Sequence, residues 1–171
     1  MNNNINFLIT CLSVIYFISP AYIANISGLI FGGNTPLDMG KNFIDKKRMI
    51  GNGVTWKGFI LGTITGTSMG IIQGIISENI IHGLILGFLL AFGALLGDAV
   101  GSFIKRRLNI NRGKPAPILD QLDFIAGSLI LASLFVEISL TTIIIATIAT
   151  LILHLLSNTG AYLIGIKDVW Y

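Results

Sequence analysis

Five apolar segments, each close to the length of a membrane span, constrain this chain more than any other feature. They cover about residues 7–26, 58–76, 80–100, 122–136 and 139–163. A helix of about 20 apolar residues crosses the hydrocarbon core of a bilayer. Only 11% of the 171 residues are charged, whereas a typical soluble domain has about 25%. The sequence therefore predicts an all-α integral membrane protein with five transmembrane helices in a single membrane domain, residues 1–171.

The positive charges predict how the chain is oriented in the membrane. All 11 Lys and Arg residues lie in the segments 27–57 and 101–121 or after the fifth span. The opposite loops carry only Glu78 and Glu137 as charged residues. Because basic loops remain in the cytoplasm, we expect both basic loops and the C-terminus on the cytoplasmic face, with the N-terminus outside. The net charge of +3 reflects this asymmetry and does not indicate nucleic-acid binding.

Glycines recur at helical spacing in the second and third spans. The second span has one such row, and the third span has two, consisting of Gly58, Gly62, Gly66, Gly70 and Gly74, then Gly83 and Gly87, then Gly93, Gly97 and Gly101. Small residues at this spacing allow helix backbones in a membrane to approach closely. We therefore predict tight helix packing along these rows. The alternative use of such a row is a groove for a lipid chain.

Three aspartates lie at the predicted cytoplasmic boundary. Asp98 lies near the end of the third span, and Asp120 and Asp123 share a face at the start of the fourth. Acids close to a membrane are costly without a partner, and carboxylate oxygens suit a hard divalent cation. We predict that these three aspartates bind metal. The simpler alternative is that they cap helices at the interface.

Basic and polar residues flank these acids. Ser102, Lys105 and Arg106 follow Asp98, and Lys114 lies in a glycine- and proline-containing loop. The loop 32–58 adds threonines, glycines and bases, which together hold polyphosphate in many proteins. Acids for a cation beside bases for phosphate indicate phosphate chemistry on a membrane-embedded substrate. The alternatives are bases that only set orientation and a loop that is only a solvated linker.

Polar residues inside the first and fifth spans are further candidates. His154 and Asn158 share a face near the inner half of the fifth span, and Asn25 lies at the inner end of the first. A hydrogen bond between helices is one interpretation of the pair in the fifth span. The other is that these residues line a pocket for a lipid phosphate.

Three sequence blocks resemble the archaeal CDP-archaeol synthases, which are relatives of the CDP-diacylglycerol synthases. The first block is PAYIAN at 20–25, followed by GGNTPLD and GNGVTWKG. The second is GD-x3-SFIKRR from residue 97, leading to RGKPAP and LDQLDF, and the third is HLLSNTGAYLIGIKDVW at 154–170. The resemblance covers nearly the whole chain. The chain departs from the family pattern at three positions, with Lys46 for glycine, Val54 for lysine and Lys57 for arginine.

The resemblance implies a CTP-dependent cytidylyltransferase of membrane lipid synthesis that uses Mg²⁺. The phosphate of di-O-geranylgeranylglyceryl phosphate, an isoprenoid ether lipid, would attack the α-phosphorus of CTP, giving CDP-archaeol and pyrophosphate. On this basis we assign metal binding to Asp98, Asp120 and Asp123, and catalytic roles to these three with Lys105 and Arg106. The predicted nucleotide contacts are Thr35, Arg48, Gly53, Thr55, Lys57 and Lys114. The predicted lipid-phosphate pocket consists of Asn25, Ser102, His154 and Asn158.

Other membrane functions are compared on the same residues. A CDP-diacylglycerol synthase acting on phosphatidic acid and a small transporter stay open as alternatives. An intramembrane aspartyl protease requires Gly-x-Gly-Asp, but Leu95 stands at its first glycine. A CDP-alcohol phosphotransferase requires Asp-Gly, but Ala99 follows Asp98. The chain is thus expected to be a multi-pass cell-membrane enzyme with its active site on the cytoplasmic face, and its oligomeric state stays open.

Overall fold

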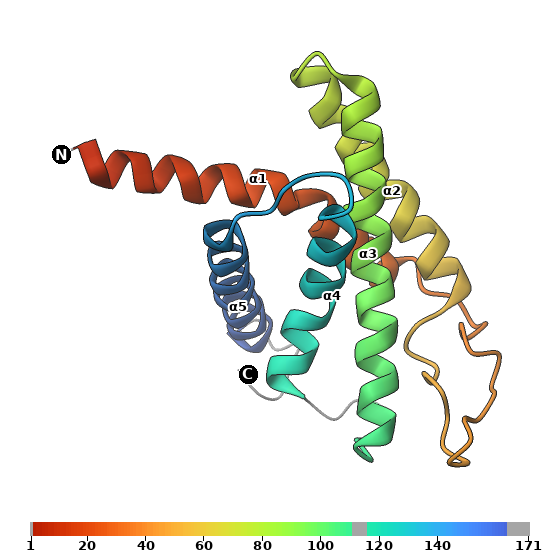
Figure 1. The fold of residues 1–171 in the computed structure, drawn as a ribbon. Helices are drawn as coiled ribbons and strands as arrows, with labels where there is room; N and C mark the ends of the chain where they lie inside the picture. Colours follow the sequence, from red (N-terminus) through yellow and green to blue (C-terminus); the bar gives the residue numbers. More distant parts are fainter. Residues whose placement is uncertain (1, 111–115, 164–171) are drawn as a thin grey trace.

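A computed structural model of the chain describes residues 2–110 and 116–163. Within these ranges the chain forms five helices (Figure 1): α1 (Asn2–Ile30), α2 (Trp56–Ile76), α3 (Ile80–Arg107), α4 (Pro117–Ala132) and α5 (Leu140–Leu163). Three of them, α1, α2 and α3, are long and apolar enough to cross a membrane. The predicted all-helical architecture is therefore confirmed, with membrane-crossing length and composition in three helices.

Three helices differ by several residues from the predicted boundaries. α1 covers Asn2–Ile30 rather than 7–26. α3 continues to Arg107, about two turns beyond the predicted end of the span, because its last turn is basic and positive charge is favoured at a helix C-terminus. Much of the loop predicted for 101–121 is therefore helical. α4 begins at Pro117 rather than at 122 and ends at Ala132 rather than at 136. Its 16 residues measure about 24 Å, which is shorter than the roughly 30 Å hydrocarbon core.

The first glycine row packs α2 against both α1 and α3. A Cβ atom placed on Gly70 would lie 3.0 Å from the backbone nitrogen of Gly87 and closer still to its Cα. A Cβ on Gly66 would lie 2.5 Å from the Cβ of Ala91 in α3 and 2.8 Å from the Cβ of Ala24 in α1. At these positions the three helices approach so closely that only glycine, with a hydrogen atom as its side chain, fits. This confirms the predicted tight packing.

The second glycine row of α3 packs against α4 instead. A Cβ on Gly93 would lie 2.6 Å from the carbonyl oxygen of Gly127, and a Cβ on Gly97 would lie 2.9 Å from the carbonyl carbon of Asp123. The two rows of α3 thus contact different neighbours. This α3–α4 seam places the start of α4 beside the end of α3.

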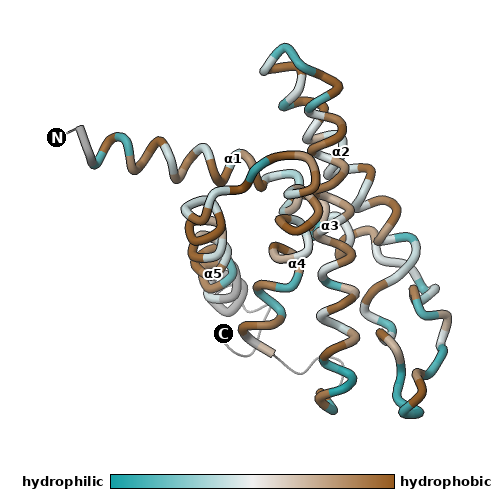
Figure 2. Tube along the Cα trace, viewed as in Figure 1, coloured by the Kyte–Doolittle hydropathy of each residue, from teal (hydrophilic) through white to brown (hydrophobic). Residues whose placement is uncertain are grey.

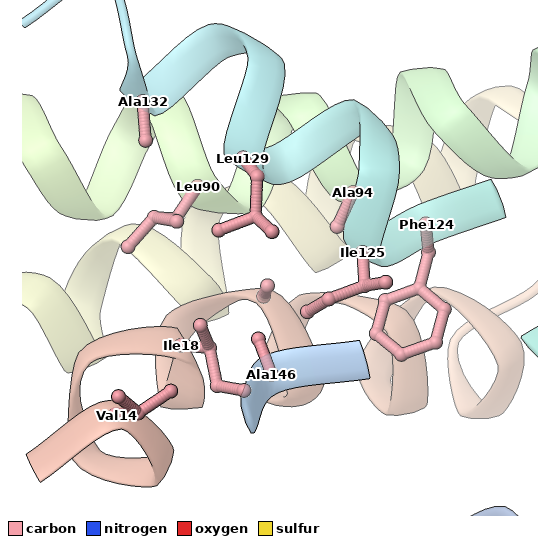
Figure 3. Packing of buried hydrophobic residues seen from close by; sticks show 10 residues of the cluster. Val14, Ile18, Leu90, Ala94, Phe124, Ile125, Leu129, Ala132 and Ala146 are labelled. Carbon is pink, nitrogen blue, oxygen red and sulfur yellow. The ribbon is translucent and has the colours of Figure 1, made fainter. Parts of the chain in front are cut away.

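The apolar core lies where α1, α3, α4 and α5 converge (Figure 3). Ile18, Leu90 and Phe124 are almost completely buried there. The hydroxyl groups of Tyr22 in α1 and Thr150 in α5 lie 2.8 Å apart, which ties α5 to this core. α1 extends from the core so that its N-terminal half projects away from the other helices (Figure 1).

The basic residues that the structure describes gather at one end of the α2–α3 hairpin. Figure 2 shows hydrophilic residues along the loop between α1 and α2 and at the end of α3, at the bottom of the view, as well as at the α2–α3 turn. The short α2–α3 turn lies at the opposite end (Figure 1). The two basic segments therefore share one end of the molecule, as the predicted topology requires.

Candidate active site

The seam between α3 and α4 brings Lys105 and Asp120 together. The Lys105 ammonium donates to Oδ1 of Asp120 at 2.7 Å. The other carboxylate oxygen, Oδ2, accepts the backbone N–H of Ala116 at 3.0 Å, so it satisfies one of the free N–H groups at the start of α4. Both oxygens of Asp120 thus have protein partners, which is the helix-capping role that the sequence left as an alternative.

Asp123 lies one turn further along α4 and has an unsatisfied carboxylate oxygen. Its Oδ1 accepts the backbone N–H of Phe124 at 2.7 Å. Its Oδ2 is buried and has no hydrogen-bond partner among the described residues. Buried polar atoms are normally paired, and each exception calls for an explanation. A carboxylate oxygen of this kind fits a cation ligand.

Asp98 is half-buried on α3. Its charge repels those of Asp123 and Asp120, and Lys105 attracts it. Across residues 2–110 and 116–163, no group of three or more His, Cys, Asp or Glu side chains is arranged to hold a metal ion. The carboxylates still open to a cation are those of Asp98 and Asp123. Binding of one metal by all three predicted aspartates stays a prediction.

The first loop is the segment 31–55, which joins α1 to α2. A basic cavity of about 540 Å³ lies between this loop and the end of α3. Three of its lining residues, Lys47, Arg48 and Arg106, are positively charged. Gly51 also lines it with φ of 101°, a left-handed conformation that glycine adopts readily. A Cβ at this position would lie 3.1 Å from Nε of Arg106. The cavity therefore combines positive charge with polar backbone, as an anion site requires.

Asp38 organises the first loop, and sequence reasoning assigned it no role. Its side chain is completely buried and accepts two hydrogen bonds from Arg48, at 2.8 and 3.3 Å. It also accepts three backbone N–H groups, those of Gly40, Ile50 and Gly51. The segment GGNTPLD had marked this region. The signal for Asp38 itself was an acid in a loop otherwise rich in bases.

The three consecutive bases at the end of α3 have different contacts. Arg106 donates to the carbonyl oxygen of Ile50 at 3.1 Å and thus holds the first loop. Arg107 pairs with Asp45 at 2.6 Å, and its guanidinium lies 4.7 Å from the ring centroid of Phe103. Only Lys105 points to the acids of α4. The triplet therefore fastens the loop to α3 as well as supplying charge.

The other predicted nucleotide contacts lie around the start of α2. The Thr55 hydroxyl caps α2 by accepting the N–H of Gly58 at 3.2 Å and also accepts that of Gly33 at 3.0 Å. It is buried in this role. Thr35, Gly53 and Lys57 are exposed and do not line the basic cavity. Of the predicted nucleotide contacts among the described residues, Arg48 alone lines this cavity.

The predicted lipid-phosphate pocket draws on three helices. Asn25 in α1 and His154 in α5 are half-buried, and Ser102 in α3 is buried. The side chain of Asn158 falls outside what the structure describes, as does Lys114, which is predicted at the nucleotide. The grouping of these residues into one pocket stays a prediction.

The charge of Asp38 should stabilise the first loop over a wide pH range. Burial by itself would raise the pKa of this carboxyl group, but the Arg48 guanidinium and the backbone N–H groups outweigh burial and lower the pKa below its ordinary value. The stabilisation is fully present above the unfolded pKa of about 3.9. It is lost only as the pH falls through the lower folded value.

Asp38→Asn should therefore loosen the loop at neutral pH, since it removes a buried charge partner of Arg48. We expect trypsin to cleave at exposed Lys41 and Lys46 about tenfold faster or more, because charged hydrogen bonds contribute about 1.5–3 kcal/mol. The wild-type loop should be equally protected at pH 5 and pH 8 after correction for the activity of trypsin. Equal cleavage of variant and wild type would contradict this role.

Comparison with known proteins assigns the chain to a family. The sequence profile of the CarS-like family, described as CDP-archaeol synthase, matches residues 5–171. The chain belongs to the CDP-archaeol synthase family. The resemblance of the three sequence blocks is thereby confirmed.

Curated relatives and a solved structure agree with this membership. The CDP-archaeol synthase of Methanothermobacter thermautotrophicus is 64% identical over 171 residues, 100% of each chain. That of Methanocaldococcus jannaschii is 54% identical, over 92% of this chain and 95% of the relative. A solved intramembrane enzyme for archaeal membrane lipid biosynthesis is similar in structure, with a TM-score of 0.80 and 40% identity. That match covers 86% of this chain and 93% of the other.

Proposed function

We propose that the chain makes CDP-archaeol and pyrophosphate from CTP and di-O-geranylgeranylglyceryl phosphate. The observation that carries the proposal is the position of Asp123, because its carboxylate lies where an apolar groove and the charged end of the molecule meet. Family membership supports the same reaction.

The apolar groove runs between α3 and α4 and has a volume of about 420 Å³. Leu96, Val100 and Ile104 from α3 and Leu122 from α4 are among its lining residues. Among the described residues that line it, Asp123 is the only charged one. A lipid chain and a phosphate group can therefore approach this carboxylate from opposite sides, as a lipid cytidylyltransferase needs.

The side chains have separate tasks in this reaction. Lys47, Arg48 and Arg106 line the cavity that suits the triphosphate of CTP, and Lys105 lies beside the acids. Asp98 and Asp123 would hold Mg²⁺, which when bound neutralises phosphate oxygens and stabilises the developing charge on pyrophosphate. Asp120 would contribute to the same site through its charge.

The chemistry requires alignment more than proton transfer. An oxygen of the lipid phosphate forms a bond to the α-phosphorus of CTP, while the bond to the bridging oxygen of the β-phosphate breaks. The bonding electrons leave with pyrophosphate. Because the lipid phosphate is already ionised at neutral pH, it needs no general base. Fixed positive charges around the leaving group provide most of the transition-state stabilisation.

The same arrangement supports an orientation in the membrane. We infer five transmembrane segments with the N-terminus outside and the C-terminus in the cytoplasm. The basic loop and the end of α3 lie together (Figure 1), and basic segments remain cytoplasmic. The active site therefore faces the compartment that contains CTP.

The deciding experiment uses purified protein in detergent with Mg²⁺ and radiolabelled CTP. The ether lipid phosphate and phosphatidic acid are offered in parallel, and CDP-lipid formation is followed. We expect product from the ether lipid. Product from both lipids would widen the function to a general CDP-lipid synthase. No product from either lipid, with folded protein, would overturn the enzyme proposal in favour of a transporter.

A further inference from the structure

Gly101 and the side chain of Asp123 are in direct contact across the α3–α4 seam. Gly101 is buried on α3. A Cβ atom placed on it would lie 2.7 Å from the Cβ and 2.8 Å from the Cγ of Asp123, and closer still to its Oδ2. Cβ atoms in proteins essentially never approach other atoms to less than 3.0 Å. The carboxyl group of Asp123 therefore occupies the space that any larger residue at position 101 would need.

The other glycines of the same row face a different part of α4. A Cβ on Gly93 would meet the carbonyl oxygen of Gly127 at 2.6 Å and the Cα of Ser128 at 2.8 Å. A Cβ on Gly97 would meet the backbone carbonyl of Asp123. Of the three glycines in this row, Gly101 alone faces the carboxyl group. The others determine how closely the two helices approach.

We propose that Gly101 is a positioning residue for the Asp123 carboxylate. This inference rests on the proposed function, in which Asp123 helps to hold Mg²⁺. The missing side chain at 101 lets the carboxylate lie flat against α3, while the N–H of Phe124 fixes its Oδ1. Together these contacts hold the unpaired Oδ2 in one place before a cation arrives. Preorganised ligands of this kind determine metal affinity.

A methyl group at 101 should therefore displace the carboxylate as well as the helices. The carboxyl group is the mobile end of a short side chain, and rotating it away relieves two of the three closest contacts. The third contact, with the Cβ of Asp123 at 2.7 Å, requires the helices to move slightly apart. A methyl group at Gly93 has no such outlet, because both of its closest contacts are with backbone atoms of α4. Gly93→Ala must separate the helices and so serves as a matched control in the same seam.

The test compares Gly101→Ala, Gly93→Ala and the wild type in detergent. Two quantities are measured for each: the rise in thermal unfolding midpoint on adding Mg²⁺ with a fixed concentration of CTP, and the Mg²⁺ concentration that gives half-maximal CDP-lipid formation. We expect Gly101→Ala to weaken Mg²⁺ binding by about 10–100-fold, the usual effect of disturbing a residue that supports a metal ligand. The half-maximal Mg²⁺ concentration should rise by that factor, and the Mg²⁺-induced rise in unfolding midpoint should shrink. Gly93→Ala should lower the midpoint without Mg²⁺ and leave the half-maximal concentration unchanged.

Two results would overturn the proposal. One is a folded Gly101→Ala protein with the wild-type Mg²⁺ requirement, and the other is an equal change of that requirement in Gly93→Ala. If Gly101→Ala does not fold, Asp123→Gly is added to it, because only glycine removes the Cβ of Asp123 together with its carboxyl group. Removing the whole side chain should then restore folding, and failure to restore it would also overturn the contact.

The Mg²⁺-induced rise in midpoint separates this inference from the proposed function. Ligand binding to the folded state raises its stability whether or not product forms. A wild-type protein that makes no CDP-lipid would overturn the proposed reaction. The effect of Gly101→Ala on Mg²⁺ stabilisation would still decide whether residue 101 positions the carboxylate.

Discussion

Asp123→Ala should lower CDP-lipid formation by about three orders of magnitude while the protein stays folded. A bound metal ion supplies several kcal/mol of charge stabilisation in the transition state, and each 1.4 kcal/mol or so is about tenfold in rate. The unfolding midpoint without Mg²⁺ should stay the same or rise, because the variant removes a carboxylate whose buried Oδ2 lacks a partner. Initial rates and thermal unfolding in detergent check both expectations.

Glu137→Ala is the matched control for this variant. Glu137 is an exposed acid beyond the opposite end of α4 from the site, in the loop before α5. Its removal should leave both the rate and the midpoint unchanged. Substantial activity in Asp123→Ala, with Glu137→Ala unchanged, would rule out Asp123 as a metal ligand. Loss of folding in Asp123→Ala would instead show that its carboxylate is structural.

Gly70→Leu should prevent the α2–α3 hairpin from closing. Even a single Cβ at this position would clash with the backbone of α3 at Gly83 and Gly87. Overpacking usually costs about 1–3 kcal/mol where side chains can adjust. Here the neighbouring atoms belong to a backbone, so we expect a larger loss. The yield of monodisperse protein on size exclusion in detergent should fall to background.

Ser68→Leu tests whether the position matters rather than the added side chain. Ser68 is exposed on the same helix, so leucine there adds similar volume to a surface that lipid or detergent covers. Its yield should match the wild type. A Gly70→Leu protein that is monodisperse with a wild-type unfolding midpoint would contradict the close approach of the two helices.

Most of the fold could be predicted from the sequence, because span length and residue spacing are local properties of the chain. Apolar runs of bilayer length predicted the helices, and glycines spaced four apart predicted the faces on which they pack. Helix ends were less accurate, as at Arg107 and Pro117. Helix ends depend on capping and on end charges, whereas hydropathy shows only where the apolar run stops. The motif resemblance identified the family that the comparisons show.

The candidate site was only partly predictable, because residues of the same type have different partners in the folded protein. Asp120 and Asp123 have the same side chain on the same face of α4. The first pairs with Lys105, and the second retains an unpaired oxygen. Thr55, expected at the nucleotide, caps α2. Asp38, at the centre of the first loop, differed in the sequence only as an acid among bases, because its partners are mostly backbone N–H groups that residue types do not reveal.

The sequence by itself determined that this is a membrane protein, where its helices lie, which of their faces carry small residues, and its family. These properties depend on hydrophobicity, spacing and residue identity along the chain. Tertiary structure alone decided which carboxylate is left without a partner and which glycine makes room for it. That distinction arises because α3 and α4 approach so closely that a single missing Cβ, at Gly101, determines where the carboxyl group of Asp123 can lie.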